Sequence, residues 1–270
     1  MRFEYRSKSF DIEGASQDDH IYRQIFRTSN FYEIDLLEYI YKLKPFIYLK
    51  GKINICIDIG ANIGNHSVFF SSFFADHLIA IEPNPNVLGQ LRRNLSRNAE
   101  NYTLIECAVG EKESRGTIVL PKSLKDNVGA AKVNVEKNGG DIKISTLDSV
   151  VSPWNKNSEN SVSVCFIKID VEGMEIQVLK GAVKTIRKYK PHVFAEAATK
   201  KDFRKIYSYL QSLGYKRMPG FWAATPVYHF AHSPTFALIA ATHWWQFRRE
   251  ASGIRSRLAR RFQNLFAYSS

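Results

Sequence analysis

Acidic residues and glycines stand where short apolar runs of the sequence end. Asp58 comes just before the turn Gly60-Ala61-Asn62-Ile63-Gly64. Glycine allows close backbone approach and left-handed dihedrals, and asparagine is one of the few other residues that tolerate them. A dinucleotide-binding turn needs GxGxxG and receives a pyrophosphate, whereas this turn is GxxxG with an acid just before it. An acid there would repel a pyrophosphate but suits the ammonium group of an amino-acid cofactor.

Glu82 closes the next apolar run, about 20 residues after the glycine turn, where an acid can accept both ribose hydroxyls of an adenosine cofactor. This placement argues against a 2′-phosphate. The alternative is a tight strand-to-helix turn that binds no ligand. Further candidates follow later runs, namely Ala108, Asp170, Glu172 and Glu196.

The elements that must position these residues alternate between apolar runs and helical patterns. Strands are predicted over Ile53–Ile59, Leu78–Ile81, Tyr102–Val109, Thr117–Leu120, Asp141–Ser145, Val162–Ile169 and His192–Ala197. Helices are predicted within residues 19–50, over Gly64–Ala75, from Pro85 behind an Asn84 cap, and over Gly173–Tyr189 and Asp202–Leu213. This alternation indicates an α/β fold, a mostly parallel twisted sheet with helices on both faces.

In such a sheet, ligands bind beyond the carboxyl ends of the strands, so we expect the acids that follow these apolar runs to meet at one edge of the sheet. Two polar stretches, Pro121–Gly140 and Ser152–Ser161, are predicted loops that shape the pocket of a substrate. We divide the chain into an N-terminal helical cap (1–50), the α/β domain (51–230) and a basic amphipathic tail (231–270).

Three segments, DIGANIGNHS, IEPNP and FIKIDVEGMEIQVLKGA, resemble the FkbM-type methyltransferases. The resemblance runs from about Asp19 to about Tyr215 and is most specific over Ile167–Ala182. It implies a Rossmann-like methyltransferase fold, S-adenosylmethionine as cofactor, and O-methylation of a hydroxyl on a sugar, glycan or other natural-product scaffold.

The resemblance also implies roles by motif position. Asp58, Gly60, Ala61, Asn62 and Gly64 would surround the methionine portion of the cofactor. Glu82 would hold the ribose, and Ala108 would lie near the adenine. Asp170 and Glu172 would face the reacting centre.

A sugar-type hydroxyl is a poor nucleophile until its proton begins to leave, and a positioned general base contributes about 10²–10⁴ in rate. The acids at strand ends are Asp170, Glu172 and Glu196, and His66 is a further candidate. Converging acids could instead hold a divalent metal that lowers the hydroxyl pKa. His192 begins its strand, at the wrong edge of the sheet, and is discarded.

Each candidate also has a structural alternative. Glu172 could cap the helix expected from Gly173, where an anion is favoured. Glu196 could be the partner of a lysine, and His66 could be a solvated or capping residue.

The net charge of +12 would suit nucleic acid, an anionic membrane or an anionic substrate. Base methyltransferases commonly carry an Asn/Asp-Pro-Pro-aromatic turn, but here the position reads Asp170-Val171-Glu172-Gly173, whose carboxylates would repel a phosphate backbone. A nucleic-acid substrate is therefore disfavoured. A third hypothesis, an inactive methyltransferase fold at a membrane, is opposed by the intact glycine turn and Glu82.

The tail, residues 241–270, combines tryptophans, an apolar helical face and six arginines against Glu250, as in interfacial helices that bind anionic membranes. The alternative is a helix packed on its own domain or on a partner subunit. The N-terminus lacks the apolar region of a signal peptide, and Phe236–Phe247 is too short to cross a bilayer. With three cysteines and no CxxC pair, we expect a cytoplasmic protein, peripheral to a membrane if the tail binds one.

Overall fold

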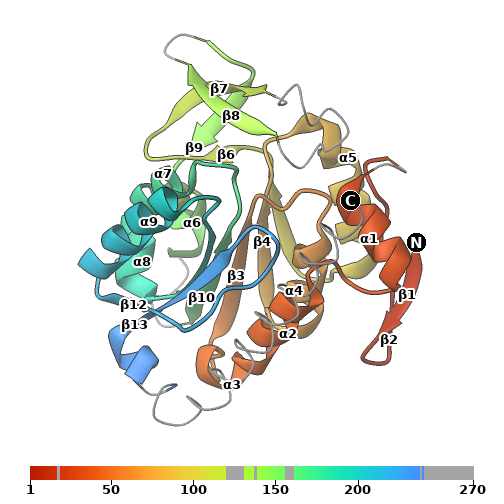
Figure 1. The fold of residues 1–270 in the computed structure, drawn as a ribbon, viewed down its shortest axis with the longest axis horizontal. Helices are drawn as coiled ribbons and strands as arrows, with labels where there is room; N and C mark the ends of the chain where they lie inside the picture. The colour runs from red at the N-terminus through yellow and green to blue at the C-terminus, as the bar shows by residue number, and fades with distance from the viewer. Residues whose placement is uncertain (17–18, 120–130, 137–138, 156–160, 238, 240–270) are drawn as a thin grey trace, which may run out of the picture.

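The computed structural model describes residues 1–16, 19–119, 131–136, 139–155, 161–237 and 239. A seven-stranded sheet forms its centre, in the order β12-β13-β11-β10-β3-β4-β5 (Figure 1). Its strands are β3 (Ile53–Ile59), β4 (His77–Ile81), β5 (Tyr102–Ile105), β10 (Val162–Ile169), β11 (His192–Glu196), β12 (Tyr215–Arg217) and β13 (Val227–His232). The five strands from β5 to β11 are parallel, so the predicted α/β fold is confirmed.

The antiparallel edge of the sheet is a difference from the prediction. β13 pairs with β11 and with β12, antiparallel to both. Neither strand was predicted, because both carry polar residues between their apolar ones. β13 also extends to His232, slightly past the predicted domain end at residue 230.

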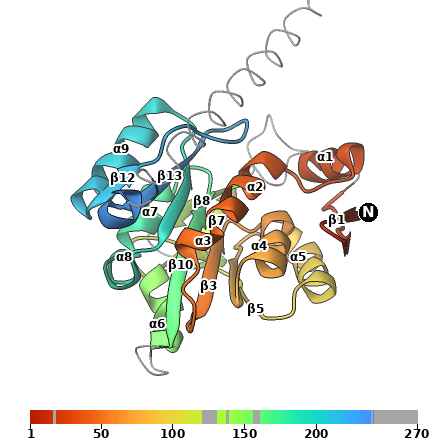
Figure 2. The ribbon, with the colours of Figure 1, turned by 90° about the horizontal axis from the view of Figure 1, so that it is seen from below.

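Helices cover both faces of the sheet, as Figure 2 shows. On one side lie α1 (His20–Thr28), α2 (Ile34–Lys42), α3 (Lys44–Ile47), α4 (Asn65–Phe73) and α5 (Pro85–Asn98). On the other lie α6 (Leu147–Asn155), α7 (Glu175–Lys180), α8 (Val183–Tyr189) and α9 (Lys200–Ser212). Side chains alternate along β3, so Ile55 and Ile57 join the core under α6–α9 while Cys56 joins the core under α2–α5.

The first fifty residues share a core with the α/β domain. The three helices α1–α3 confirm the helical prediction, but a hairpin of β1 (Arg2–Tyr5) and β2 (Lys8–Asp11) precedes them and was not predicted. Phe10 of the hairpin packs edge-on against Phe31, at 4.9 Å between ring centroids. This segment therefore packs as part of the α/β domain and places some of its side chains at the edge of the sheet.

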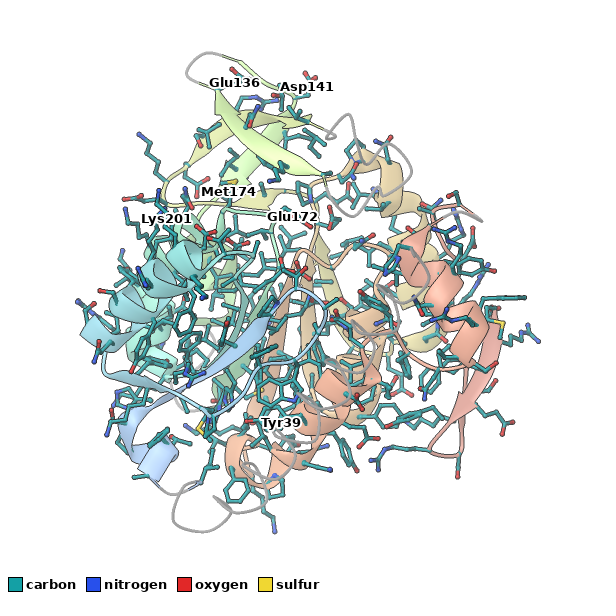
Figure 3. The ribbon with its side chains drawn as sticks, in the orientation of Figure 1. Tyr39, Glu136, Asp141, Glu172, Met174 and Lys201 are labelled. Atoms are coloured by element: carbon teal, nitrogen blue, oxygen red, sulfur yellow. The ribbon has the colours of Figure 1, made fainter. Side chains whose placement is uncertain are left out.

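A small second sheet stands beyond the carboxyl ends of the central strands, with Glu136 and Asp141 at its far end (Figures 1 and 3). It consists of β6 (Ala108–Val109), β7 (Ser114–Val119), β8 (Lys132–Glu136) and β9 (Ile142–Ser145), in the order β6-β9-β7-β8. The predicted strand Tyr102–Val109 is thus divided between two sheets. The predicted loop Pro121–Gly140 contains β8, and α6 extends into the predicted loop Ser152–Ser161.

The helix predicted over Gly173–Tyr189 is interrupted, because α7 ends at Lys180 and α8 begins at Val183. A Cβ on Gly181, in the interruption, would lie 1.9 Å from the carbonyl oxygen of Gly110. The chain here is pressed against the loop that follows β6, which only glycine permits.

The predicted membrane-binding tail, residues 241–270, lies outside the described residues. Within the described part of the chain, no helix combines the length and apolarity needed to cross a bilayer. The three cysteines are buried thiols, and the Sγ atoms of Cys56 and Cys165 lie 3.3 Å apart on neighbouring strands.

Candidate functional site

The strand order reverses between β3 and β10, which is where open α/β sheets form a binding crevice. From β3 the chain proceeds to β4 and β5 on one side, and from β10 to β11 on the other. A cavity of about 900 Å³, counting space open to solvent, lies at this point. Ile118 and Val133 of the small sheet and Ile21 of α1 also line it, so it is enclosed from three directions.

The glycine turn after β3 owes its glycines to packing within the protein. Gly60 has φ +81°, and a Cβ on it would lie 1.7 Å from the carbonyl oxygen of Asp170. Gly64, at φ +88°, precedes α4, and a Cβ there would lie 2.8 Å from Cδ1 of Leu91. The atoms that a Cβ on either glycine would meet are therefore protein atoms, and close approach of a ligand to the backbone here stays a prediction. Of the two, only Gly60 is among the described lining residues.

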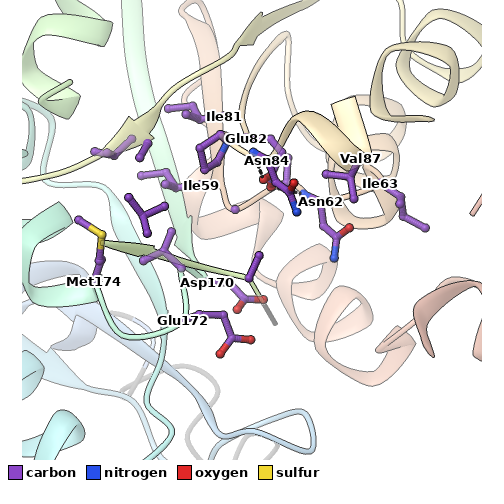
Figure 4. Close-up of a pocket in the computed structure, with 18 of the residues that line it drawn as sticks. Ile59, Asn62, Ile63, Ile81, Glu82, Asn84, Val87, Asp170, Glu172 and Met174 are labelled. Carbon is purple, nitrogen blue, oxygen red and sulfur yellow. Dashed lines mark hydrogen bonds between the residues drawn. The ribbon is translucent and has the colours of Figure 1, made fainter. Parts of the chain in front are cut away.

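The carboxylate of Glu82 joins the turn to the end of β4. Its Oε2 accepts the N–H of Asn62 at 2.8 Å, and its Oε1 accepts the N–H of Asn84 at 2.8 Å. Asn62 has φ +53°, the left-handed backbone that the sequence indicated. Burial raises the pKa of Glu82 to about 7, although these two hydrogen bonds oppose the rise. Figure 4 shows all three side chains on one side of the cavity.

Asp58 does not face this cavity. It points to the other surface of β3, under α4, where Ser67 Oγ donates a hydrogen bond to it at 2.6 Å and Lys168 Nζ lies 3.4 Å away. Lys168 is its register partner on β10. The expectation that Asp58 meets a cofactor ammonium directly is corrected, because that ammonium position is held by a lysine of the chain itself. Burial raises the pKa of Asp58, against the opposing charge of Lys168.

Three predicted acids do converge, and two of them, Asp170 and Glu172, lie on the opposite side of the cavity from Glu82 (Figure 4). One carboxylate oxygen from each of Asp170, Glu172 and Glu196 lies within 4.8 Å of the others. Lys168 Nζ is 3.2 Å from Asp170 Oδ2 and belongs to the same group. Asp170 and Glu172 line the cavity, and Glu196 joins them through Asp170.

A hydrogen bond joins the carboxyl groups of Asp170 and Glu196. Burial, the charge of Asp170 and a hydrogen bond to it raise the pKa of Glu196 to about 10, so Glu196 is the protonated member and donates. Burial would raise the pKa of Asp170 too, but Lys168 and the Glu196 hydrogen bond bring it below its usual value. Within the described residues, the partner of Glu196 is thus Asp170 and not the lysine of the alternative.

The alternative role for Glu172 is also wrong. The helix begins at Glu175, and Glu175 Oε1 accepts the N–H of Gly173 at 2.9 Å. Glu172 instead has a left-handed backbone, φ +53°, and its carboxylate points toward that of Asp170 (Figure 4). A strained backbone at a carboxylate that lines a cavity is typical of a functional site.

His66, near the start of α4, lines the cavity and is buried rather than solvated. Its Nε2 lies 3.4 Å from Oε2 of Glu33. Burial lowers the pKa of His66 to about 3, and burial with the charge of Asp170 raises the pKa of Glu33 to about 7. His192 is remote, as expected: it begins β11, and its Nδ1 is 2.7 Å from Nε2 of His229 on β13.

Three residues of this neighbourhood were not predicted. Lys168 had a signal, since it is a lone charge inside the apolar run of β10. Tyr32 and Glu33 had none, because they precede α2 and reach the site only through tertiary packing. Cys107 and Ala108 line the cavity where β5 gives way to β6, and the predicted contact of Ala108 with an adenine stays a prediction.

The methyltransferase FkbM domain model matches residues 58–217 of this chain. The hexuronic acid methyltransferase AglP of Haloferax volcanii is 33% identical over 132 residues, covering 48% of this chain and 50% of AglP. The methyltransferase sdnD of Sordaria araneosa is 28% identical over 188 residues, covering 60% of this chain and 67% of sdnD.

Among solved structures, a methyltransferase FkbM from Methylobacillus flagellatus is similar, with 22% identity and a TM-score of 0.47. The similarity covers 70% of this chain and 47% of that one. This chain thus spans about half the length of AglP and of the M. flagellatus protein.

Proposed function

Because the chain belongs to the FkbM methyltransferase family, we propose that it uses S-adenosylmethionine to methylate a hydroxyl of a sugar, glycan or other natural-product scaffold. The observation that carries this proposal is Glu82. Its buried carboxylate borders the cavity at the switch point, fixed by one backbone N–H on each oxygen. Each carboxylate oxygen can accept a second hydrogen bond. A vicinal diol such as that of ribose supplies two donors at a matching spacing.

The cavity also fits the rest of this cofactor. Asn62 Oδ1 is buried without a hydrogen-bond partner within the described ranges, and a buried acceptor of that kind needs a donor from a ligand. The ammonium or hydroxyl groups of the cofactor would supply such donors. Gly60 and Ala61 would surround the methionine portion, and Cys107 and Ala108 would contact the adenine. Asp58 and Gly64 would contribute by shaping the turn.

S-adenosylmethionine supplies a methyl group already activated on a sulfonium. The protein then has to align an acceptor oxygen with it, and alignment is the larger part of such catalysis. The carboxylates of Asp170 and Glu172 face the cavity and would accept hydrogen bonds from the acceptor hydroxyls. Lys168 fixes the orientation of Asp170 from behind.

The alternative function of these acids is to bind a divalent metal ion. Asp170, Glu172 and Glu196 offer oxygen ligands within 4.8 Å of one another, which suits a hard cation. The ammonium of Lys168, 3.2 Å from Asp170, already supplies a positive charge at this point. We therefore favour transfer without a metal, and a chelator distinguishes the two readings.

The acceptor is proposed from chemistry and from the relatives. The acid-rich cavity wall suits a polyhydroxylated acceptor whose hydroxyls donate to carboxylates, and the name of AglP gives a sugar derivative, hexuronic acid, as the substrate of that relative. A nucleic-acid acceptor is the second candidate, favoured by the net charge of +12. It is opposed by the acids at the reacting side, which would repel phosphates.

The test uses radiolabelled S-adenosylmethionine with three acceptors: p-nitrophenyl β-D-glucopyranoside, p-nitrophenyl β-D-glucuronide and total RNA. We expect label on a glycoside, stable to mild alkali as a methyl ether is, and none on RNA. Label lost in alkali would indicate a methyl ester on the uronic carboxylate, and label on RNA alone would overturn the proposal. The Glu82→Ala variant, assayed in parallel, should lose cofactor affinity without unfolding.

A further inference from the structure

Glu33 has an unusual backbone for its type and stands outside the family-matched residues 58–217. It precedes α2 at φ +56°, a left-handed conformation that a glutamate adopts rarely. Its carbonyl accepts the N–H of Leu36 at 2.9 Å, but its side chain makes no capping bond within the described structure. The side chain turns instead toward His66. A strained residue whose side chain points at a candidate site suggests that the strain serves the site.

His66 offers an acceptor atom to the cavity. Its ring hydrogen-bonds the backbone of Tyr32, and this bond raises its pKa, as expected of a ring N–H that donates to a carbonyl. The other nitrogen, Nε2, is buried and has no hydrogen-bond partner among the residues that the structure describes. A neutral imidazole with one N–H donating has its second nitrogen free as an acceptor. The tautomer with the proton on Nδ1 therefore leaves the Nε2 lone pair available.

Two acceptors face each other here. Glu33 Oε2 is 3.4 Å from His66 Nε2, and the Tyr32 hydroxyl hydrogen-bonds the Glu33 carboxylate from the other side. Such a pair is satisfied only when a proton lies between them or when a ligand hydroxyl donates to one of them. The cavity beside His66 admits a ligand, since His66 and Tyr32 both line it.

Two of the three strand-end acids, Asp170 and Glu196, are less suited to take up a proton. Asp170 is neutralised by Lys168 at 3.2 Å and receives the hydrogen bond of Glu196, and both lower its pKa. Glu196 already carries a proton. Both acids thus have their carboxylates engaged by neighbours. Burial keeps the pKa of His66 low as well, but its Nε2 is unprotonated and has no hydrogen-bond partner among the described residues, so what favours His66 is this unengaged atom at the cavity.

We propose that His66 accepts the proton of the acceptor hydroxyl and that Glu33 positions His66 and stabilises its charged form. This inference rests on the proposed function. In the transfer, the hydroxyl O–H bond breaks and its proton moves to Nε2 of His66. The hydroxyl oxygen forms its bond to the methyl carbon, and the carbon–sulfur bond breaks with its electron pair left on sulfur. The imidazolium then faces the Glu33 carboxylate and afterwards returns its proton to solvent.

The pair gives this step a pH dependence. Below the Glu33 pKa of about 7, the protonated Glu33 carboxyl donates a hydrogen bond to His66 Nε2, so that this nitrogen cannot accept the substrate proton. Above this pH, Nε2 is free and the ionised Glu33 carboxylate lies beside it. The groups that act on Glu33 are the Tyr32 hydroxyl, His66 on α4, Lys168 on β10 and Asp170 just after that strand. Glu196, at the end of β11, acts on Tyr32. We expect the rate to fall about tenfold for each pH unit below 7, as for a single essential ionisation.

The first test needs no acceptor. Nitrogen-15 NMR of the full chain, labelled at histidine and saturated with S-adenosylhomocysteine, reports the tautomer of each ring, and the His66→Gln variant identifies the His66 signals. We expect Nδ1 protonated and Nε2 unprotonated, with a His66 shift that titrates near pH 7 and ceases to titrate in Glu33→Gln. Protonation of Nε2 in place of Nδ1 would overturn the proposal, because that ring could not accept the proton.

The second test measures rate and affinity separately, with whichever of the two p-nitrophenyl glycosides the wild type methylates. We expect His66→Gln to lower the single-turnover rate by about 10²–10⁴. Glu33→Gln should lower it less and abolish its fall below pH 7. Both should bind S-adenosylhomocysteine within about threefold of wild type. Glu38→Gln, on the helix that Glu33 precedes but paired with Arg6 at the surface, is the matched control and should behave as wild type.

The outcomes distinguish failure of the proposed function from failure of the role of His66 and Glu33. Failure of the wild type to bind S-adenosylhomocysteine would refute the proposed function itself. Normal binding with the opposite tautomer, or with a His66→Gln rate within a few-fold of wild type, would refute only the role of this pair. Loss of affinity at an unchanged saturated rate would assign His66 to cofactor binding.

Discussion

Glu82 provides the most quantitative prediction, because its ionisation and its proposed ligand are linked. Its folded-state pKa is about 7 against an ordinary 4.5, since the carboxylate is buried. A ribose diol donates to the ionised carboxylate and binds the protonated form poorly. The affinity for S-adenosylhomocysteine should therefore rise with pH as Glu82 loses its proton.

The magnitude follows from the ionised fraction. With a pKa of about 7, that fraction is about 9% at pH 6 and about 91% at pH 8, so the dissociation constant at pH 6 should be about tenfold larger. Glu82→Gln removes the ionisation. It should weaken binding at pH 8 by roughly 1.5–3 kcal/mol, the usual contribution of hydrogen bonds to a charged group, and should show little pH dependence.

Titration calorimetry at pH 6, 7 and 8 measures both effects. Repeating the pH 6 titration in two buffers of different ionisation enthalpy counts the protons released on binding, and we expect close to one for the wild type and close to zero for Glu82→Gln. An affinity that is flat with pH in the wild type would refute the reasoning. The reasoning would also be refuted if the Glu82→Gln variant kept the pH dependence, because another group would then be responsible for it.

Three further predictions follow from the site. Asp170→Asn should lower the turnover of glycoside methylation by about 10² or more, and the wild type should stay active in excess chelator; inactivation by chelator would establish the metal reading instead. Gly60→Ala should abolish soluble expression or destabilise the protein by several kcal/mol, because its Cβ would lie 1.7 Å from the Asp170 carbonyl oxygen. Gly51→Ala, with a similar φ of +81° and no atom of the described structure within 4 Å, should cost only about 1–2 kcal/mol of backbone strain in chemical denaturation, and equal effects would contradict the steric argument. Lys168→Met should destabilise the protein by about 3–5 kcal/mol, since it leaves the buried Asp58 without its cation, whereas Lys180→Met at a surface ion pair should cost less than about 1 kcal/mol in the same denaturation assay.

The sequence predicts the centre of this fold well, because strands buried on both faces appear as continuous apolar runs. β3 and β10 have the predicted bounds, Ile53–Ile59 and Val162–Ile169. The Asn84 cap is also confirmed, since its side chain accepts the N–H of Asn86 at the start of α5. Glu82, which directly follows β4, and Asp170, which directly follows β10, consequently lie at the cavity.

Features that depend on register or on distant contacts were not predictable in this way. Asp58 is adjacent to the glycine turn in sequence, but its orientation follows from strand alternation and its partner from the β3–β10 register. Glu33 reaches His66 only because α2 packs on α4. The antiparallel strands β12 and β13 mix polar and apolar residues, so their sequence lacks the apolar run that identified the inner strands.

The central claim is that the cavity at the β3–β10 switch point holds S-adenosylmethionine with its reactive end toward Asp170. A crystal structure of the full chain with S-adenosylhomocysteine tests this most directly. We predict the ribose hydroxyls on the Glu82 carboxylate, the adenine beside Cys107 and Ala108, and the sulfur on the side of Asp170 and Glu172. Ligand bound elsewhere, or bound here with the adenine against the acids, would contradict the account.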